Sequence, residues 1–472
     1  MNTSCCATKI INRKGKNMKR TRISLAVISM LLIFATALNL IGCTSEGVRN
    51  DITKESGKSN VTTSTTTTTT ANTDDDEPPV VYEEIKAENL MEGIAPSQVN
   101  APDDLSEQNK AVTDFALRLF RESETSGENT LISPLSVLCA LAMTANGAKE
   151  ETLSQMEAVL GMSVEELNLY LYSYVKNLPQ GEKYKLSLAN SIWFTDDERF
   201  TVNRDFLQTN ADYYGADIYK APFNDQTLKD INNWVKQNTD NMIPGVLDEI
   251  PQDAIMYLIN ALAFDSEWGT KYEENQVRDG EFTKEDGTKQ AAEFMYGSEE
   301  SYLEDEYATG FIKKYYSGKY AFVALLPKEG TSVSEYMATL DGESLSDLLN
   351  SAQYADVRTS LPKFETEYAV EMAEVLEAMG MTEAFDPSSA DFEGLGSSDT
   401  GNIYLSRVIH KTFISVAEKG TKAGAVTASG MADESAPPEE KREVYLDRPF
   451  VYMLIDCENN IPFFIGTLMD VE

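Results

Sequence analysis

The stretch NTLISPLSVLCALAMTANGAKEETLSQMEAVLG, residues 129–161, contains the most informative helix of the chain. Ser133 is of a type that caps helices, and Pro134 suits the first helical position, where its missing N–H group leaves no hydrogen bond unmade. Residues 135–145 are apolar nearly all round, and an Asn-Gly pair follows as a stop signal. The sequence therefore predicts a buried helix here.

The segments around this helix combine helical and strand patterns. Apolar residues recur at helical spacing between residues 111 and 120, with Asp103 or Ser106 available as a cap. Further on, the continuous apolar runs 257–259, 322–326 and 451–455 are typical of interior strands. Helices dominate the first half and strands the second, without a regular βαβ alternation, and this pattern predicts an α+β fold.

Nine short segments occur in the order in which one protein family has them. Besides 129–161 they are 188–193, 214–216, 260–268, 361–364, 374–385, 410–411, 447–450 and 464–467. In these segments the chain resembles the serpins, from about residue 106 to the C-terminus. The resemblance implies the serpin fold, in which helices pack around a large central mixed β-sheet, with smaller sheets and an exposed reactive-centre loop.

The segment 418–429, EKGTKAGAVTAS, is unusual for a folded domain because it has so little to bury. Composition alone also fits a flexible surface loop. However, residues 421, 423, 425 and 427 are small and uncharged, and they share one face of an extended chain. A loop that must become a central strand needs such a face. By resemblance this is the hinge of an inhibitory serpin: Glu418, Gly420, Thr421, Ala423, Ala425 and Thr427.

The resemblance implies a mechanism that needs no catalytic residue of the chain's own. A metastable fold exposes the loop as bait, and a protease that attacks it forms an acyl-enzyme. The freed loop then inserts into the large sheet. At roughly 3.3 Å per residue, about fifteen inserted residues would carry the protease about 50 Å and distort its active site.

The family pattern puts the cleaved bond sixteen positions after the hinge glutamate, at Glu434-Ser435. A count back from Pro449 gives a bond near Pro438, so the loop is extended on its C-terminal side. A shift of one to three residues brings in three alternatives: Asp433, Ala432 and Met431. No Lys or Arg occurs between residues 423 and 440, so we expect glutamyl-specific or elastase-like target proteases and no trypsin-like ones.

His410 is the only histidine, and no nucleophile–base signature accompanies it, so we expect no enzyme activity. By resemblance it belongs with Ser133, Ser136 and Asn260 to a buried polar cluster where strands part during insertion. Trp268 matches the family's contact where the hinge enters the sheet, although an ordinary core tryptophan is the alternative. No CxxC pair or Cys/His cluster indicates a metal, and no cofactor is expected.

The first 43 residues predict a lipoprotein signal peptide, with Met18 as the true start. A basic segment precedes the apolar run 23–41, which ends in LIGC, a match to the lipobox of bacterial lipoproteins. Cleavage before Cys43 and lipidation of its thiol would place the protein on the outer face of the cell membrane. An uncleaved transmembrane anchor and simple secretion are the alternatives.

Residues 44–89, rich in Thr and Asp, predict a disordered linker, and residues 90–472 predict the serpin domain. With 77 acidic and 40 basic residues the chain has a net charge of −37, which disfavours nucleic acid and membrane surfaces as partners. We expect a monomer that meets the membrane only through its lipid. Cys139 and Cys457 are either two separate thiols or one disulfide.

Together these features favour an irreversible suicide inhibitor of extracellular serine proteases, with cysteine proteases as further candidates. A non-inhibitory serpin-fold module for binding at the cell surface is the alternative.

Overall fold

Helix α2, Pro134–Ala145, runs through the interior, and all of its residues are buried. The Ser133 hydroxyl caps it by accepting a hydrogen bond from the Ser136 N–H at 3.4 Å. The predicted buried helix is thus confirmed. Gly147, just after its end, is needed for packing, because a Cβ atom there would lie 2.5 Å from the Leu395 side chain.

The computed structural model describes residues 82–101, 104–198, 200–250, 255–399, 401–421 and 441–471. The helices in this part of the chain are α1 (Ser106–Ser123), α2, α3 (Glu150–Leu160), α4 (Val164–Asn177), α5 (Arg204–Tyr214), α6 (Asp225–Asn238), α7 (Val333–Thr339), α8 (Gly342–Asn350) and α9 (Ala373–Ala378), with 3-10 turns η1 (Glu274–Gln276) and η2 (Glu383–Phe385). None of these helices combines the length and the apolar character needed to cross a membrane. The N-cap of α1 is Leu105, without a side-chain capping hydrogen bond, so the expected cap at Ser106 was wrong. The alternative, Asp103, lies outside the described residues.

The large mixed sheet has seven strands. Their order is β1 (Glu88–Asn89), β5 (Asp217–Ala221), β3 (Tyr184–Thr195), β6 (Met256–Glu267), β15 (Gly420–Thr421), β14 (Arg407–Ala417) and β12 (Phe364–Glu371). Strands β3 and β5 are parallel, as are β6 and β14, and the other pairs are antiparallel.

A second sheet has nine strands, and a third has two. The second runs in the order β16 (Lys441–Tyr445), β11 (Gln353–Pro362), β8 (Lys289–Glu304), β9 (Ala308–Lys314), β10 (Tyr320–Pro327), β17 (Phe450–Asp456), β18 (Ile461–Leu468) and β2 (Thr130–Ile132), with β7 (Val277–Thr283) paired to β8. The third joins β4 (Phe200–Val202) to β13 (Gly396–Ser398). The α+β prediction is confirmed, and the three apolar runs lie in β6, β10 and β17 as expected.

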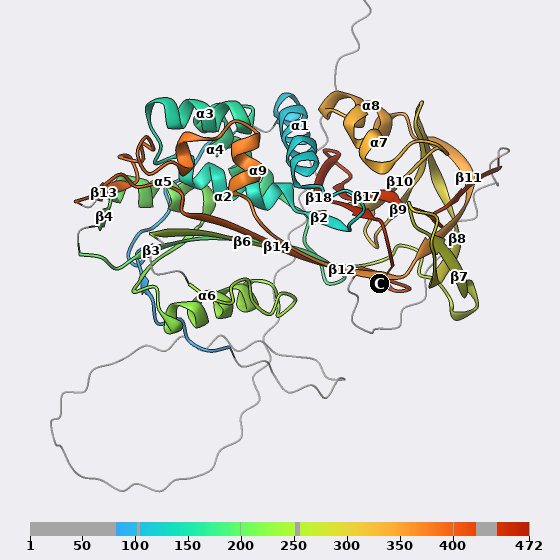
Figure 1. Cartoon of the computed structure of the whole chain (residues 1–472), viewed down its shortest axis with the longest axis horizontal. Helices are drawn as coiled ribbons and strands as arrows, with labels where there is room; N and C mark the ends of the chain where they lie inside the picture. Colours follow the sequence, from blue (N-terminus) through green and yellow to red (C-terminus); the bar gives the residue numbers. More distant parts are fainter. Residues whose placement is uncertain are drawn as a thin grey trace, which may run out of the picture. The chain divides into compact units, whose positions relative to one another are not determined.

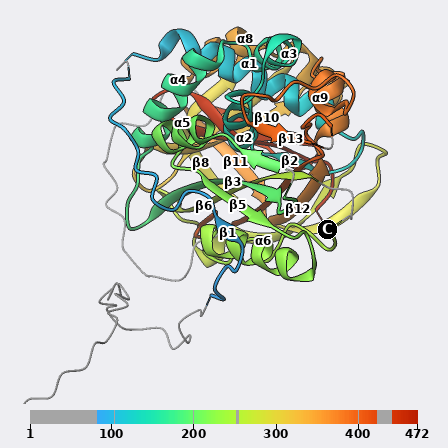
Figure 2. The ribbon, with the colours of Figure 1, turned by 90° about the vertical axis from the view of Figure 1, so that its left-hand side faces the viewer.

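Both faces of the seven-stranded sheet are covered. Figures 1 and 2 show α6 on one face, while the other helices, including α2, lie on the opposite side. Alternate residues of β6 divide accordingly: Tyr257 and Ile259 pack with Trp234 of α6, and Leu258 and Leu262 join the main core that contains α2. A strand inserted next to β6 would therefore be buried on both faces.

The folded unit begins earlier than the predicted boundary at residue 90. Glu88 and Asn89 pair with Lys220 and Tyr219 of β5, so this end of the predicted linker belongs to the domain. The Lys86 N–H also bonds to Asp230 of α6 at 3.1 Å. The predicted signal peptide, Cys43 and the linker up to residue 81 lie outside the described residues.

Candidate functional site

The chain doubles back between the two middle strands of the large sheet. After β14 it turns at Glu418 and Lys419, and β15 pairs antiparallel with β14 on one side and with β6 on the other. Further down, β6 and β14 pair directly with each other, from Tyr257–Arg407 to Asn260–His410. Two residues of the predicted hinge thus already lie between strands that are neighbours below them.

Gly420 is required at the entry of this segment. A Cβ atom at this position would lie 2.1 Å from the Ser266 carbonyl oxygen and 2.8 Å from the Glu267 Cα atom. Since both are backbone atoms of β6, no side-chain rotation relieves the clash. Only glycine lets the hinge approach β6 closely enough to pair with it.

Thr421 is buried, with 1% of its surface exposed, and its hydroxyl lies 2.6 Å from that of Tyr315. The Tyr315 ring stacks on Trp268 at 4.5 Å between centroids. Trp268 in turn donates from its indole N–H to the Ala417 carbonyl at 2.7 Å, and its backbone N–H bonds to Lys419. Trp268 therefore lies where the hinge enters the sheet, and it supports both ends of the turn.

An ion pair holds the outside of the turn. The Lys363 ammonium lies 2.8 Å from the Glu418 carboxylate and 3.0 Å from Glu293. Partial burial opposes ionisation of Glu418, but the hydrogen bond from Lys363 lowers the pKa of this carboxyl below its usual value. The same contacts raise the pKa of Lys363. Both groups are charged at neutral pH, and they fasten β14 to the end of β11.

The predicted polar cluster forms where β6 and β14 first pair. The Ser133 N–H donates to Nε2 of His410 at 3.0 Å, so the ring proton is on Nδ1, which faces Asn260 Oδ1 at 2.9 Å. The Ser136 hydroxyl donates to the same Asn260 oxygen at 3.1 Å. Among the described residues the Asn260 Nδ2 group has no partner. All four residues are buried, and the cluster joins α2 to both strands.

This cluster makes stability depend on pH. Burial lowers the pKa of His410 from 6.5 to about 3, so only an unfolded chain takes up this proton between those values. The stabilisation that comes from keeping His410 neutral is complete above pH 6.5. It is lost as the pH falls toward 3, at up to about 1.4 kcal/mol of unfolding free energy per pH unit. Urea unfolding at pH 7.5 and 4.5 should show a loss of roughly 2–3 kcal/mol that His410→Gln does not share. An identical pH dependence in both proteins would contradict this role of His410.

The remaining predicted site residues lie outside the described part of the chain. They are Ala423, Ala425 and Thr427 of the hinge, and Met431, Ala432, Asp433, Glu434 and Ser435 around the predicted bond. Three described residues were missed: Tyr315, Lys363 and Thr412, whose hydroxyl bonds to the Leu131 carbonyl at 2.7 Å. Cys139 and Cys457 are separate thiols and form no disulfide, which decides the alternative left open above.

Comparisons with known proteins agree with this geometry. Residues 110–471 match the family Serpin (serine protease inhibitor). The crystal structure of the thermophilic serpin tengpin in the native state is 50% identical and gives a TM-score of 0.78, covering 82% of this chain and 100% of that chain. In the latent state the same serpin gives a TM-score of 0.70 over 80% of this chain and 100% of that chain. Leukocyte elastase inhibitor A of Mus musculus is 28% identical over 77% of this chain and 99% of its own length.

Proposed function

The chain belongs to the family Serpin (serine protease inhibitor), and on this basis we propose that it is an irreversible suicide inhibitor of extracellular proteases and not an enzyme. Cleavage of its loop would leave the protease as an acyl-enzyme, and insertion of the loop between β6 and β14 would trap it. A serine protease is the first expected target, and a cysteine protease forms an equivalent acyl-enzyme.

The strand register supports this proposal most strongly. Thr421 is paired with Val416 of β14 and with Ser266 of β6. Continued in the same register, residue 427 comes opposite His410 on β14 and opposite Asn260 on β6. His410 and Asn260 are themselves partners, so the register with β14 and the register with β6 independently place residue 427 at the same point of the sheet. An extension from 420 to 431 reaches Met256 at the start of β6, and twelve residues at roughly 3.3 Å span about 40 Å.

The same register explains the small residues of the hinge. Residues opposite one another in an antiparallel pair point to the same face of the sheet. Val408, Ile414 and Val416 of β14 face the main core, and so would their partners at 429, 423 and 421. Those partners are Ser, Ala and Thr, and the intervening 425 and 427 are Ala and Thr. From 421 to 429, every side chain that insertion would place on the main-core face is small and uncharged.

Insertion would also rearrange the polar cluster. Residue 427, passing between His410 and Asn260, would separate the two atoms that now lie 2.9 Å apart. Thr427 has a hydroxyl, which can accept from the Asn260 Nδ2 group, for which the described part of the chain provides no partner, and can donate to another acceptor. The lost hydrogen bond is therefore replaceable, and insertion need not leave a buried polar group unsatisfied.

We expect the full chain to form an SDS-resistant complex with a glutamyl-specific serine protease. The expected bond is Glu434-Ser435, and mass spectrometry of the released C-terminal fragment locates it. Elastase-like proteases that cut at Ala432 are the second candidates, in keeping with the elastase inhibitor among the relatives. Glu434→Gln is the matched control, because it removes the charge that a glutamyl-specific protease recognises and should abolish the complex. Release of active protease after every cut in the loop would contradict inhibition.

We further propose that the protein is held at the outer face of the cell membrane by a lipid on Cys43. The basic segment, the apolar run and the LIGC sequence support this location. Cys43→Ser should remain as unprocessed precursor or appear in the medium, and it should incorporate no labelled fatty acid. Unchanged processing and unchanged membrane attachment of Cys43→Ser would exclude lipidation.

A further inference from the structure

Residues 268–272 hold the turn at which the hinge enters the large sheet. Each of the three backbone carbonyl groups of that turn accepts a hydrogen bond from this segment. The pairs are the Trp268 indole N–H with Ala417 at 2.7 Å, the Trp268 backbone N–H with Lys419 at 2.9 Å, and the Tyr272 backbone N–H with Glu418 at 3.0 Å. The position of the turn therefore depends on the position of residues 268–272.

This segment has no regular structure of its own. Residues 269–273 belong to neither a helix nor a strand, so no ladder of strand pairing fixes them. The Gly269 N–H donates to the Lys314 carbonyl at 3.0 Å and thereby fastens the beginning of the segment to the end of β9. The rest of the segment needs side-chain contacts to keep its place.

Lys313 of β9 supplies such contacts from below the segment. Its ammonium donates to the Thr270 carbonyl at 3.1 Å. The same group lies 4.4 Å from the centre of the Tyr272 ring and 5.3 Å from that of the Trp268 ring, and both distances are in the range of cation–π interactions. A single cation thus contacts the first, the middle and the last residue of the segment.

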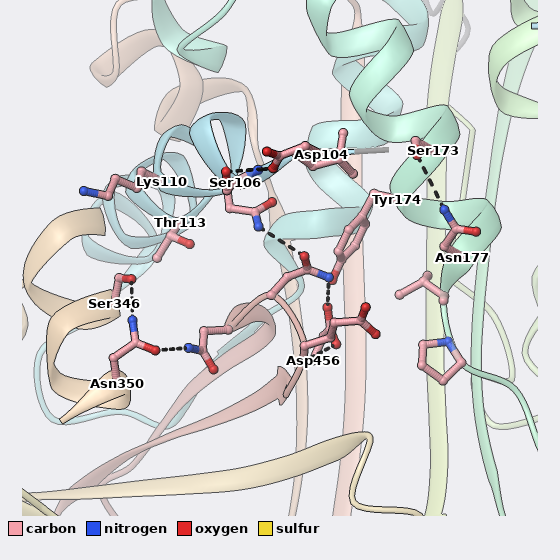
Figure 3. Close-up of a pocket in the computed structure, with 17 residues that line it drawn as sticks. Asp104, Ser106, Lys110, Thr113, Ser173, Tyr174, Asn177, Ser346, Asn350 and Asp456 are labelled. Carbon is pink, nitrogen blue, oxygen red and sulfur yellow. Dashed lines mark hydrogen bonds between the residues drawn. The ribbon is translucent and has the colours of Figure 1, made fainter. Parts of the chain in front are cut away.

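The charge of Lys313 is buried together with that of a partner. Its side chain is 2% exposed, and its ammonium lies 2.7 Å from the carboxylate of Glu299 on β8, which is 13% exposed. Burial raises the pKa of Glu299, and the Lys313 ammonium opposes this rise. By contrast Lys110, which lines the polar cavity shown in Figure 3, is 58% exposed and pairs with Glu343 at 3.7 Å. A surface pair of that kind is easily broken, whereas the buried pair is not.

Stability alone does not account for this buried ion pair. The loss of hydration offsets most of the attraction between two buried charges, and two apolar residues of similar volume often stabilise a core equally well. Apolar residues would not, however, provide the cation that contacts residues 268–272.

We propose that Lys313 is a positioning residue for the hinge. It fixes residues 268–272 so that the turn after β14 is held ready for insertion, and Glu299 keeps the ammonium directed at them. The expected effect on protease trapping rests on the proposed function, whereas the effect on the turn does not.

Hydrogen exchange of the Trp268 and Tyr272 amides tests the proposal, because these N–H groups donate to the turn. The full chain is compared with the double variant Lys313→Met and Glu299→Leu, which leaves no charge buried without its partner. Both amides should exchange about tenfold faster in the double variant, since the cation–π contacts and the bond to Thr270 are lost. Equal exchange in the two proteins would overturn the proposal.

Two further variants separate positioning from general stability. Lys313→Met alone should have a lower melting temperature, because Glu299 loses its cation, and the double variant should melt close to the wild type. Lys314→Met changes the exposed neighbour on the same strand and should match the wild type in both measurements. Fast exchange in Lys313→Met alone, with slow exchange restored in the double variant, would show that Lys313 acts only through stability and would also overturn the proposal.

Protease trapping gives a readout of the consequence for inhibition. The double variant should consume about threefold more inhibitor per trapped protease, at an unchanged rate of loop cleavage, because only insertion is slowed. Unaltered trapping by the double variant, with a wild type that does trap, would overturn the role of Lys313 in hinge entry. A wild type that traps no protease would instead contradict the proposed function, and the exchange of the two amides would still decide whether Lys313 positions the turn.

Discussion

Thr421→Arg should convert the protein from an inhibitor into a substrate of its target protease. Thr421 is 1% exposed between β6 and β14, so an arginine there must leave the sheet or bury its charge. The nearest acid of β6, Glu267, is already paired with Lys183 and Lys271 at 3.3 and 2.9 Å. Burial of an unpaired charge costs several kcal/mol, and each 1.4 kcal/mol slows insertion about tenfold. Cleavage of the loop is not slowed, so deacylation should precede trapping.

The measured quantity is the number of inhibitor molecules consumed per protease trapped, and it should rise at least about tenfold. Two controls separate charge from other effects. Thr421→Val keeps the shape and loses only the contact with the Tyr315 hydroxyl, and it should trap nearly as well as the wild type. Lys422→Arg changes the neighbouring residue, which falls on the opposite face of an extended strand. Wild-type trapping by Thr421→Arg would show that the alternating face of the hinge does not matter.

The parts of the fold that the sequence predicted well are those with a local signal. Helix α2 carries its own cap, its proline and its all-round apolar surface within about fifteen residues. The interior strands β6, β10 and β17 show as continuous apolar runs, because both of their faces are buried. Each of these elements can be predicted from the pattern of its own residues, because its burial does not depend on knowing which distant segment packs against it.

The features that were missed depend on partners far apart in the sequence. Tyr315 meets Thr421 across 106 residues, and nothing in the sequence around Tyr315 distinguishes it from an ordinary strand residue. Lys363 belongs to a motif noticed in the sequence, but its pairing with Glu418 follows only from the register of distant strands. Glu88 and Asn89 lie in a polar, acidic stretch and join the sheet because β5 offers them a free edge.

The position of Gly420 and Thr421 between β6 and β14 also follows from the fold, and not from the sequence of the hinge itself. The small residues at 421, 423, 425 and 427 predicted that this segment could insert. They did not predict that Gly420 and Thr421 already do so, because that depends on where β6 and β14 part. A sequence pattern indicates which residues tolerate burial. To predict where the hinge enters the sheet, one must also know how β6, β14 and β15 are arranged in space.

The central claim is that β6 and β14 must separate for the protease to be trapped, and a disulfide across them tests it. Ile259 and Ile409 are direct partners on the face toward α6, and neighbouring strands lie at a spacing that a disulfide can bridge. Ile259→Cys with Ile409→Cys should therefore lock the two strands together when oxidised. Burial raises the pKa of the Cys139 thiol, and it raises the pKa of the Cys457 thiol to about 11. Neither native thiol should therefore compete with the two introduced cysteines for disulfide formation.

The matched control is Ala189→Cys with Ala261→Cys, which joins β3 to β6, two strands that stay neighbours during insertion. The decisive measurement is the fraction of protease in SDS-resistant complex, with each protein oxidised and then reduced by dithiothreitol. The β6–β14 pair should give only cleaved inhibitor and free protease when oxidised, and should recover the complex when reduced, while the control traps in both states. Equal complex formation by the oxidised and reduced β6–β14 pair, or no complex in either, would contradict trapping by insertion between these strands.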